Sequence, residues 1–105
     1  MKVGNGDISQ RFLTAVDSLL LPLRAVDGFS EDAFLELSEV LQTYAELWST
    51  SEFVPKREMS VLVDLYPAIA ACSHLYQGEE ANTVMQAADT IADLIRRCVA
   101  VEWRI

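Results

Sequence analysis

The longest apolar stretch of the chain, residues 59–76, restricts the fold more than any other feature. Thirteen of its eighteen residues are hydrophobic. Four of the positions that interrupt it are Ser60, Asp64, Pro67 and His74. Together with Arg57 just before the stretch and Ala71 between them, they recur every three or four residues, which places them on one narrow stripe of an α-helix. A helix with so narrow a polar stripe must be covered by other segments on most sides. The sequence therefore predicts a central helix with further helices packed around it.

Three other stretches have the helical period of apolar residues, over residues 8–26, 31–48 and 79–100, the last with Asn82 as an alternative start. The central helix extends over 55–77. Short connections between amphipathic helices favour antiparallel neighbours. We therefore expect one all-α domain spanning residues 1–105, folded as a four-helix up-and-down antiparallel bundle. Proline lacks the backbone N–H, so Pro22 and Pro67 predict kinks in helices 1 and 3, with a split of helix 3 at Tyr66 as the alternative.

Local signals set the expected ends of these helices. Residues 1–7 contain two glycines and an asparagine, so they predict a mobile lead-in, with Asp7 as the cap of the first helix. Ser30 is the expected N-cap of the second helix, with Phe29 and Phe34 as its hydrophobic staple. The glycines at 28 and 78 are the expected left-handed stops of helices 1 and 3. Residues 102–105 form an apolar tail.

The distribution of charge is the one feature of the sequence that indicates a function. The chain of 105 residues has a formal charge of −8, which opposes binding to nucleic-acid phosphates. Seven acids and no lysine or arginine lie between Ala25 and Pro55, whereas the rest of the chain has nine acids and eight bases. Nearly all of the net charge therefore belongs to the second helix and its flanking loops.

The helical period places these acids on the outer face of the second helix, at Asp32, Glu36, Glu39 and Glu46. We expect this face to bind a basic protein surface, with Tyr44, Trp48 or Phe53 as anchors at its edge. The predicted function is a non-enzymatic interaction module that binds or inhibits a basic partner. An ordinary solvated helix face is the simpler interpretation of the same pattern.

A small all-α magnesium-dependent hydrolase is the alternative function. It would use the helically spaced carboxylate pairs Glu36 with Glu39 and Asp89 with Asp93, which the period places on outward faces. No catalytic motif supports it, and the single histidine, His74, excludes a histidine-based metal cluster within one chain. We therefore expect neither a cofactor nor a metal.

The two cysteines predict no disulfide. Cys72 and Cys98 would lie roughly 20 Å apart along antiparallel helices, beyond the reach of a disulfide bond. Both fall on apolar seams, so we expect buried structural thiols.

The tail predicts self-association. Several apolar residues have no evident place in a four-helix core of this size: Leu21, Phe53, Val54, Trp103 and Ile105. We therefore expect a homodimer, with Val101, Trp103 and Ile105 in its contact. The chain has neither a signal-peptide pattern nor an apolar run long enough to span a membrane, and we expect it in the cytoplasm. In size and charge it resembles small acidic helical bundles such as toxin-immunity proteins, phage inhibitors that mimic nucleic-acid charge, and secretion chaperones.

Overall fold

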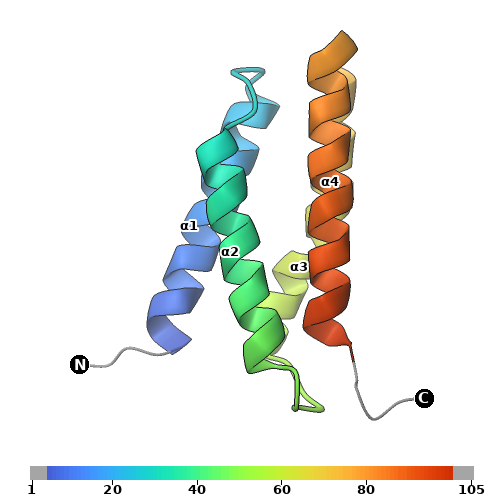
Figure 1. Cartoon of the computed structure of the whole chain (residues 1–105). Coiled ribbons are helices and arrows are strands. Elements are labelled where there is room, and N and C mark those ends of the chain that lie inside the picture. Colours follow the sequence, from blue (N-terminus) through green and yellow to red (C-terminus); the bar gives the residue numbers. More distant parts are fainter. Residues whose placement is uncertain (1–4, 101–105) are drawn as a thin grey trace.

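The computed structural model describes residues 5–100, and within that range the chain forms helices and loops without a strand. The helices are α1 (Asn5–Arg24), α2 (Glu31–Leu47), α3 (Lys56–Cys72) and α4 (Gly78–Val99), with a short 3-10 turn, η1 (Ser73–Leu75), after α3 (Figure 1). Both α1 and α4 make their main helix contacts with α2 and α3. The expected all-α fold of four packed helices is confirmed. No helix in this range is long and apolar enough to cross a membrane.

Each helix contributes one apolar face to a single core. The largest fully buried side chains come from all four helices: Phe12, Leu19, Leu23, Leu37, Val40, Leu41, Leu62, Leu65, Ile69, Val84, Ile91 and Cys98. Their spacing of three and four residues is what placed these segments in helices. Burying a large aliphatic side chain contributes about 2 kcal/mol, so this shared core is the main source of stability.

The start of α2 follows its sequence signal. The Ser30 side chain accepts a hydrogen bond from the backbone N–H of Ala33 at 3.1 Å. The rings of Phe29 and Phe34 lie 5.6 Å apart and form the expected staple. Glu31 and Asp32 occupy the first turn, where the helix dipole stabilises negative charge. Cap, staple and first-turn acids are all confirmed.

The ends of α1 differ from the prediction. The helix begins at Asn5, so residues 5–7 belong to α1 and Asp7 is not its cap. At the other end two residues have a positive φ, Val26 at 59° and Gly28 at 119°. The N–H of Asp27 bonds to the carbonyl of Pro22 and that of Val26 bonds to Leu23, the paired bonds of a Schellman cap. Gly28 does have the expected positive φ, but the cap that ends α1 lies at Val26, two residues earlier.

The centrality of α3 was overestimated. It buries one face, whereas Val63 is 58% exposed and Tyr66 is also exposed. Its predicted polar stripe does face solvent, from Ser60 to His74. The helix continues unbroken through Pro67 and ends at Cys72, five residues early, so it does not split at Tyr66.

Gly78, with φ 62°, is the first residue of α4 and not the stop of α3. The link between α3 and α4 is instead held by Tyr76. Its hydroxyl donates to the carbonyl of Leu23 at 3.0 Å and accepts from the N–H of Gly28 at 3.1 Å. This buried side chain joins the α3–α4 turn to the α1–α2 loop.

Candidate functional site

The outer face of α2 carries the predicted acids. Opposite the buried positions of this helix, Asp32, Glu39 and Glu46 are exposed and Glu36 is half-buried. Leu35 lies among them and is 52% exposed. The helical period thus separates an apolar face from an acidic one, and we call residues 32, 36, 39 and 46 the acidic face.

A cation from a different helix contacts this face. The Nε atom of Arg11, on α1, lies 2.7 Å from Oε2 of Glu36, and an Nη atom of the same guanidinium lies 3.5 Å from Oε1 of Glu39. The hydrogen bond from Arg11 lowers the pKa of Glu36, and the same bond raises the pKa of Arg11. Counting charges within residues 25–55 could not reveal Arg11, because it reaches the acids across the α1–α2 interface.

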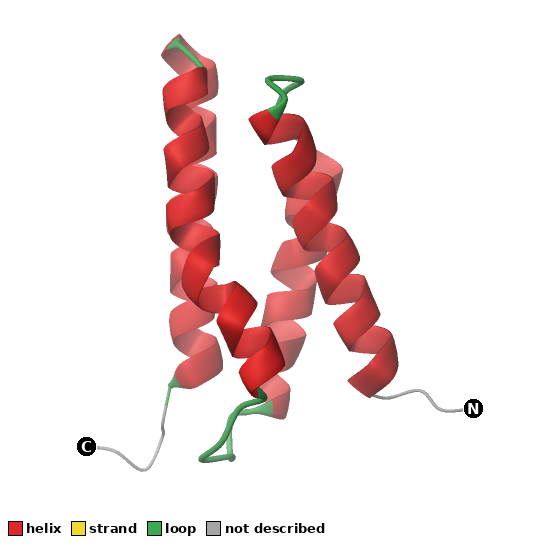
Figure 2. Ribbon diagram, turned by 180° about the vertical axis from the view of Figure 1, so that it is seen from behind, coloured by secondary structure: helices red, strands yellow, loops and turns green. Residues whose placement is uncertain are grey.

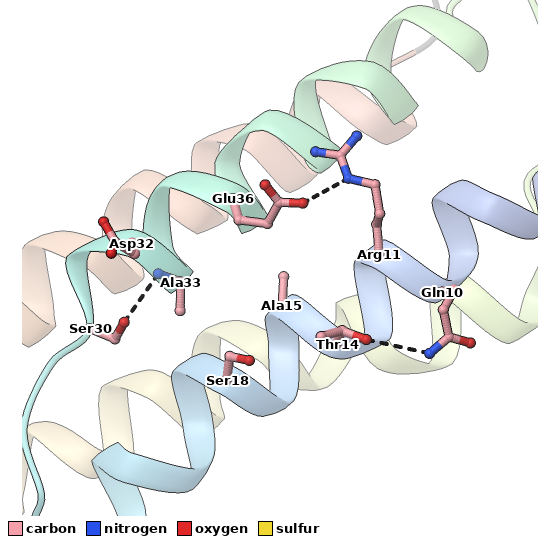
Figure 3. Close-up of a pocket in the computed structure, with 9 residues that line it drawn as sticks. All are labelled: Gln10, Arg11, Thr14, Ala15, Ser18, Ser30, Asp32, Ala33 and Glu36. Atoms are coloured by element: carbon pink, nitrogen blue, oxygen red, sulfur yellow. Dashed lines mark hydrogen bonds and ion pairs between the residues drawn. The ribbon is translucent and has the colours of Figure 1, made fainter.

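A groove of about 640 Å³ runs beside the acidic face, between α1 and α2. Figure 3 shows Arg11 reaching across it toward Glu36. Small side chains keep the groove open, among them Ala15, Ser18 and Ala33. Its walls therefore combine polar rims with a small apolar floor.

The predicted aromatic anchors lie in the core. Tyr44 is 3% exposed and Trp48 is 9% exposed, and their rings stack 4.5 Å apart. Phe12 meets Tyr44 edge to face. Burial is the main reason that the pKa of Tyr44 is raised. Neither ring is available to a partner on the acidic face, whereas Phe53 is 80% exposed.

The two carboxylate pairs required by a magnesium-dependent hydrolase do not share a cleft. Glu36 lines the α1–α2 groove, whereas Asp89 and Asp93 line a separate pocket beside Tyr66. Each pair also has its own cation, since Arg96 contacts Asp93 as Arg11 contacts Glu36. Within residues 5–100 no three acidic, histidine or cysteine side chains lie close enough to hold a metal ion. No observation favours this alternative.

A buried carboxylate, Glu58, was missed by sequence reasoning. It lies in the first turn of α3, is only 6% exposed, and its Oε2 accepts hydrogen bonds from Ser9 Oγ at 2.5 Å and Tyr44 OH at 3.4 Å. Beside it is a pocket of about 170 Å³ that Trp48 and Arg57 also line. The end pocket, as we call it, brings together α1, α2 and α3. The only sequence signal was an acid at an apolar position of α3.

The remaining predicted residues fall into two groups. Cys72 and Cys98 are free, buried thiols, as expected, and Cys98 donates to the Leu41 carbonyl at 3.3 Å. Burial raises the pKa of the Cys98 thiol to about 11, which makes it a poor nucleophile near neutral pH. The predicted dimer residues Val101, Trp103 and Ile105 lie outside the described residues.

Comparison with family models, with curated proteins and with solved structures gave no match.

Proposed function

We propose that the chain is a non-enzymatic protein-interaction module, acting in the cytoplasm, that binds or inhibits a basic protein partner through the acidic face of α2. The observation that carries the proposal is the imbalance of charge on this face. Four acids point outward, and among the described residues Arg11 is the only cation in ion-pair contact with them. Arg97 of α4 lines a pocket with Glu46 without forming an ion pair. A face of one sign steers an oppositely charged partner during encounter.

Such a role is that of an immunity protein or another small inhibitor. The exposed Leu35 offers an apolar contact within the acidic face, and the groove between α1 and α2 offers a recess for a partner's side chains. Interfaces of this kind combine a charged rim with a few apolar anchors.

The test begins with capture of a partner by the immobilised protein, followed by stopped-flow measurement of association. The variant Asp32→Lys with Glu46→Lys reverses two acids that make no ion pair among the described residues, leaving the Arg11 contacts intact. The control variant Asp64→Lys with Asp89→Lys makes the same change of net charge at exposed sites on α3 and α4. We expect the first variant to associate at least about tenfold more slowly at low salt, and the control to change little.

Raising the salt concentration should reduce the difference, because exposed charges are screened within about 10 Å at 0.1 M. A partner that associates with the first variant as fast as with the native protein would contradict the proposal.

We also propose that the four helices form an up-and-down antiparallel bundle with proline kinks in α1 and α3. Figure 1 supports the alternation, since the connecting loops lie at alternate ends of the molecule. Figure 2 supports a kink in α3, because this helix bends part-way along its length and contains Pro67. The kink of α1 rests on Pro22 alone, which lies inside that helix.

We also propose that the chain forms a homodimer through Val101, Trp103 and Ile105. The support is exposed apolar surface at described positions, of which Phe53 and Val99 are examples. Deleting residues 102–105 should then shift the mass measured by light scattering at micromolar concentration from dimer toward monomer. A monomer mass for the full chain would end this part of the proposal.

A further inference from the structure

The end pocket is lined by the carboxylate of Glu58, one oxygen of which receives no hydrogen bond from the described residues. Both hydrogen bonds that the described residues make to Glu58 end on Oε2. The other oxygen, Oε1, accepts no hydrogen bond among the described contacts, and it belongs to a carboxylate that lines the pocket. A carboxylate oxygen has lone pairs for more than one donor, so Oε1 can accept N–H bonds from a bound group.

The size and walls of the end pocket restrict what could pair with Oε1. Its volume of about 170 Å³ holds roughly five waters and is below the size of a usual cofactor site. The stacked rings of Tyr44 and Trp48 border it, and aromatic surfaces attract cations. The hydroxyls of Ser9 and Tyr44 fix the orientation of the carboxylate. The lining suits a compact cation with several N–H donors.

We propose that the end pocket binds one cationic group of the guanidinium or alkylammonium class, with Oε1 of Glu58 accepting its N–H bonds and Trp48 and Tyr44 contacting its apolar part. Arg57 also lines the pocket but makes no ion pair with Glu58 among the described contacts. It therefore acts as a like charge that weakens the ligand's binding. The proposal does not depend on the acidic face of α2.

The primary experiment is a titration of the full chain with ethylguanidinium, followed by the indole N–H signal of Trp48 in two-dimensional NMR. A Trp103→Phe variant assigns that signal. We expect a saturable shift with a dissociation constant on the order of 1 mM. Ethylurea has a similar shape but no charge, and it should leave the signal unmoved.

Three variants decide whether Glu58 is the receptor. Glu58→Gln should weaken binding at least about tenfold, because a hydrogen bond to a charged acceptor is lost. Asp64→Asn removes the same charge from an exposed site on the same helix and should change affinity less than about twofold. Arg57→Gln should strengthen binding. Equal effects of Glu58→Gln and Asp64→Asn would overturn the proposal.

Circular dichroism will show whether Glu58→Gln folds. If it does not, Leu47→Arg provides the second test, because Leu47 is an exposed residue that lines the same pocket. A tethered guanidinium at that position should compete with ethylguanidinium and weaken its binding. Unchanged affinity in Leu47→Arg would then overturn the proposal.

Blocked pentapeptides distinguish the source of the cation. A peptide with a central arginine that binds at least about tenfold tighter than ethylguanidinium identifies a polypeptide side chain as the ligand, and its citrulline counterpart should not bind. A peptide that binds no better identifies a small free cation. A failure of every cationic probe to give a saturable shift would overturn the proposal.

Discussion

The acidic face of α2 and the end pocket hold the same chemical group in two different environments. Glu36 and Glu39 stand in solvent and share one exposed guanidinium, Arg11. Glu58 is withdrawn from water and held by two hydroxyl groups. An ion pair exposed to water contributes little to the free energy of unfolding. In a buried site, each hydrogen bond made or lost changes that free energy much more. The acidic face suits long-range attraction of a cationic partner, and the end pocket suits recognition of a group in direct contact.

Removing Glu58 should give the largest change in stability. Glu58→Ala leaves the hydroxyls of Ser9 and Tyr44 without their acceptor and opens space in the end pocket, so we expect a loss of about 3 kcal/mol in the free energy of unfolding. Glu46→Ala, at an exposed site of the acidic face, should leave that free energy nearly unchanged. Urea denaturation measures both variants. Equal losses would show that burial does not distinguish the two regions.

Cys98 extends the comparison to a buried ionisable group inside the core. Its pKa of about 11 in the folded protein lies above its ordinary value of 9.0. The unfolded chain therefore loses the thiol proton first, so stability is full below about pH 9 and falls between about pH 9 and 11, by on the order of 2 kcal/mol. Unfolding curves of native protein and Cys98→Ala across this range should diverge in slope. Parallel curves would contradict the assigned pKa.

Ser38 tests the cost of a buried polar group that has no partner. Its Oγ atom is buried on α2 and makes no hydrogen bond among the described residues. Ser38→Ala removes this atom and should stabilise the protein by about 1 kcal/mol. Ser49→Ala, at a less buried site whose hydroxyl bonds to the Glu46 carbonyl, is the control and should not stabilise. Thermal unfolding of the two variants provides the measurement.

The smallest effect is expected at Arg11. Arg11→Gln removes the hydrogen bond that lowers the pKa of Glu36, so this pKa should rise toward its ordinary value. The side-chain carboxyl signal in a pH titration by NMR reports it directly. High salt should reduce the difference between native protein and variant, because the pair is exposed. An unchanged pKa of Glu36 in the Arg11→Gln variant would contradict the role assigned to Arg11 at the acidic face.

The sequence predicted what depends on local periodicity. The cap at Ser30, the four helices and the outward direction of the α2 acids all follow from spacing along one segment. Leu35 shows the limit of such an argument, because this large apolar side chain of α2 lies 52% exposed. How wide a face becomes buried depends on how closely the neighbouring helices approach, and a single helix does not encode that distance.

The parts that could not be predicted arise between segments. Arg11 meets Glu36 across 25 positions of sequence, and Ser9 meets Glu58 across 49. The end pocket exists only after α1, α2 and α3 have packed together. The positive φ of Val26 could not be predicted for a different reason. A β-branched residue strongly disfavours the left-handed region, so the local preference of valine argued against this conformation.

The central claim is that the acidic face of α2 presents a negative field to partners even with Arg11 in contact. The most direct test compares the relaxation of backbone amide signals caused by a cationic and by an anionic nitroxide of the same size. We expect the cationic probe to dominate at the amides of Leu35, Glu39 and Glu46, and to dominate less at Asp89 and Asp93 on α4, where Arg96 and Arg97 are near in sequence. Equal enhancement by both probes along α2 would contradict the claim.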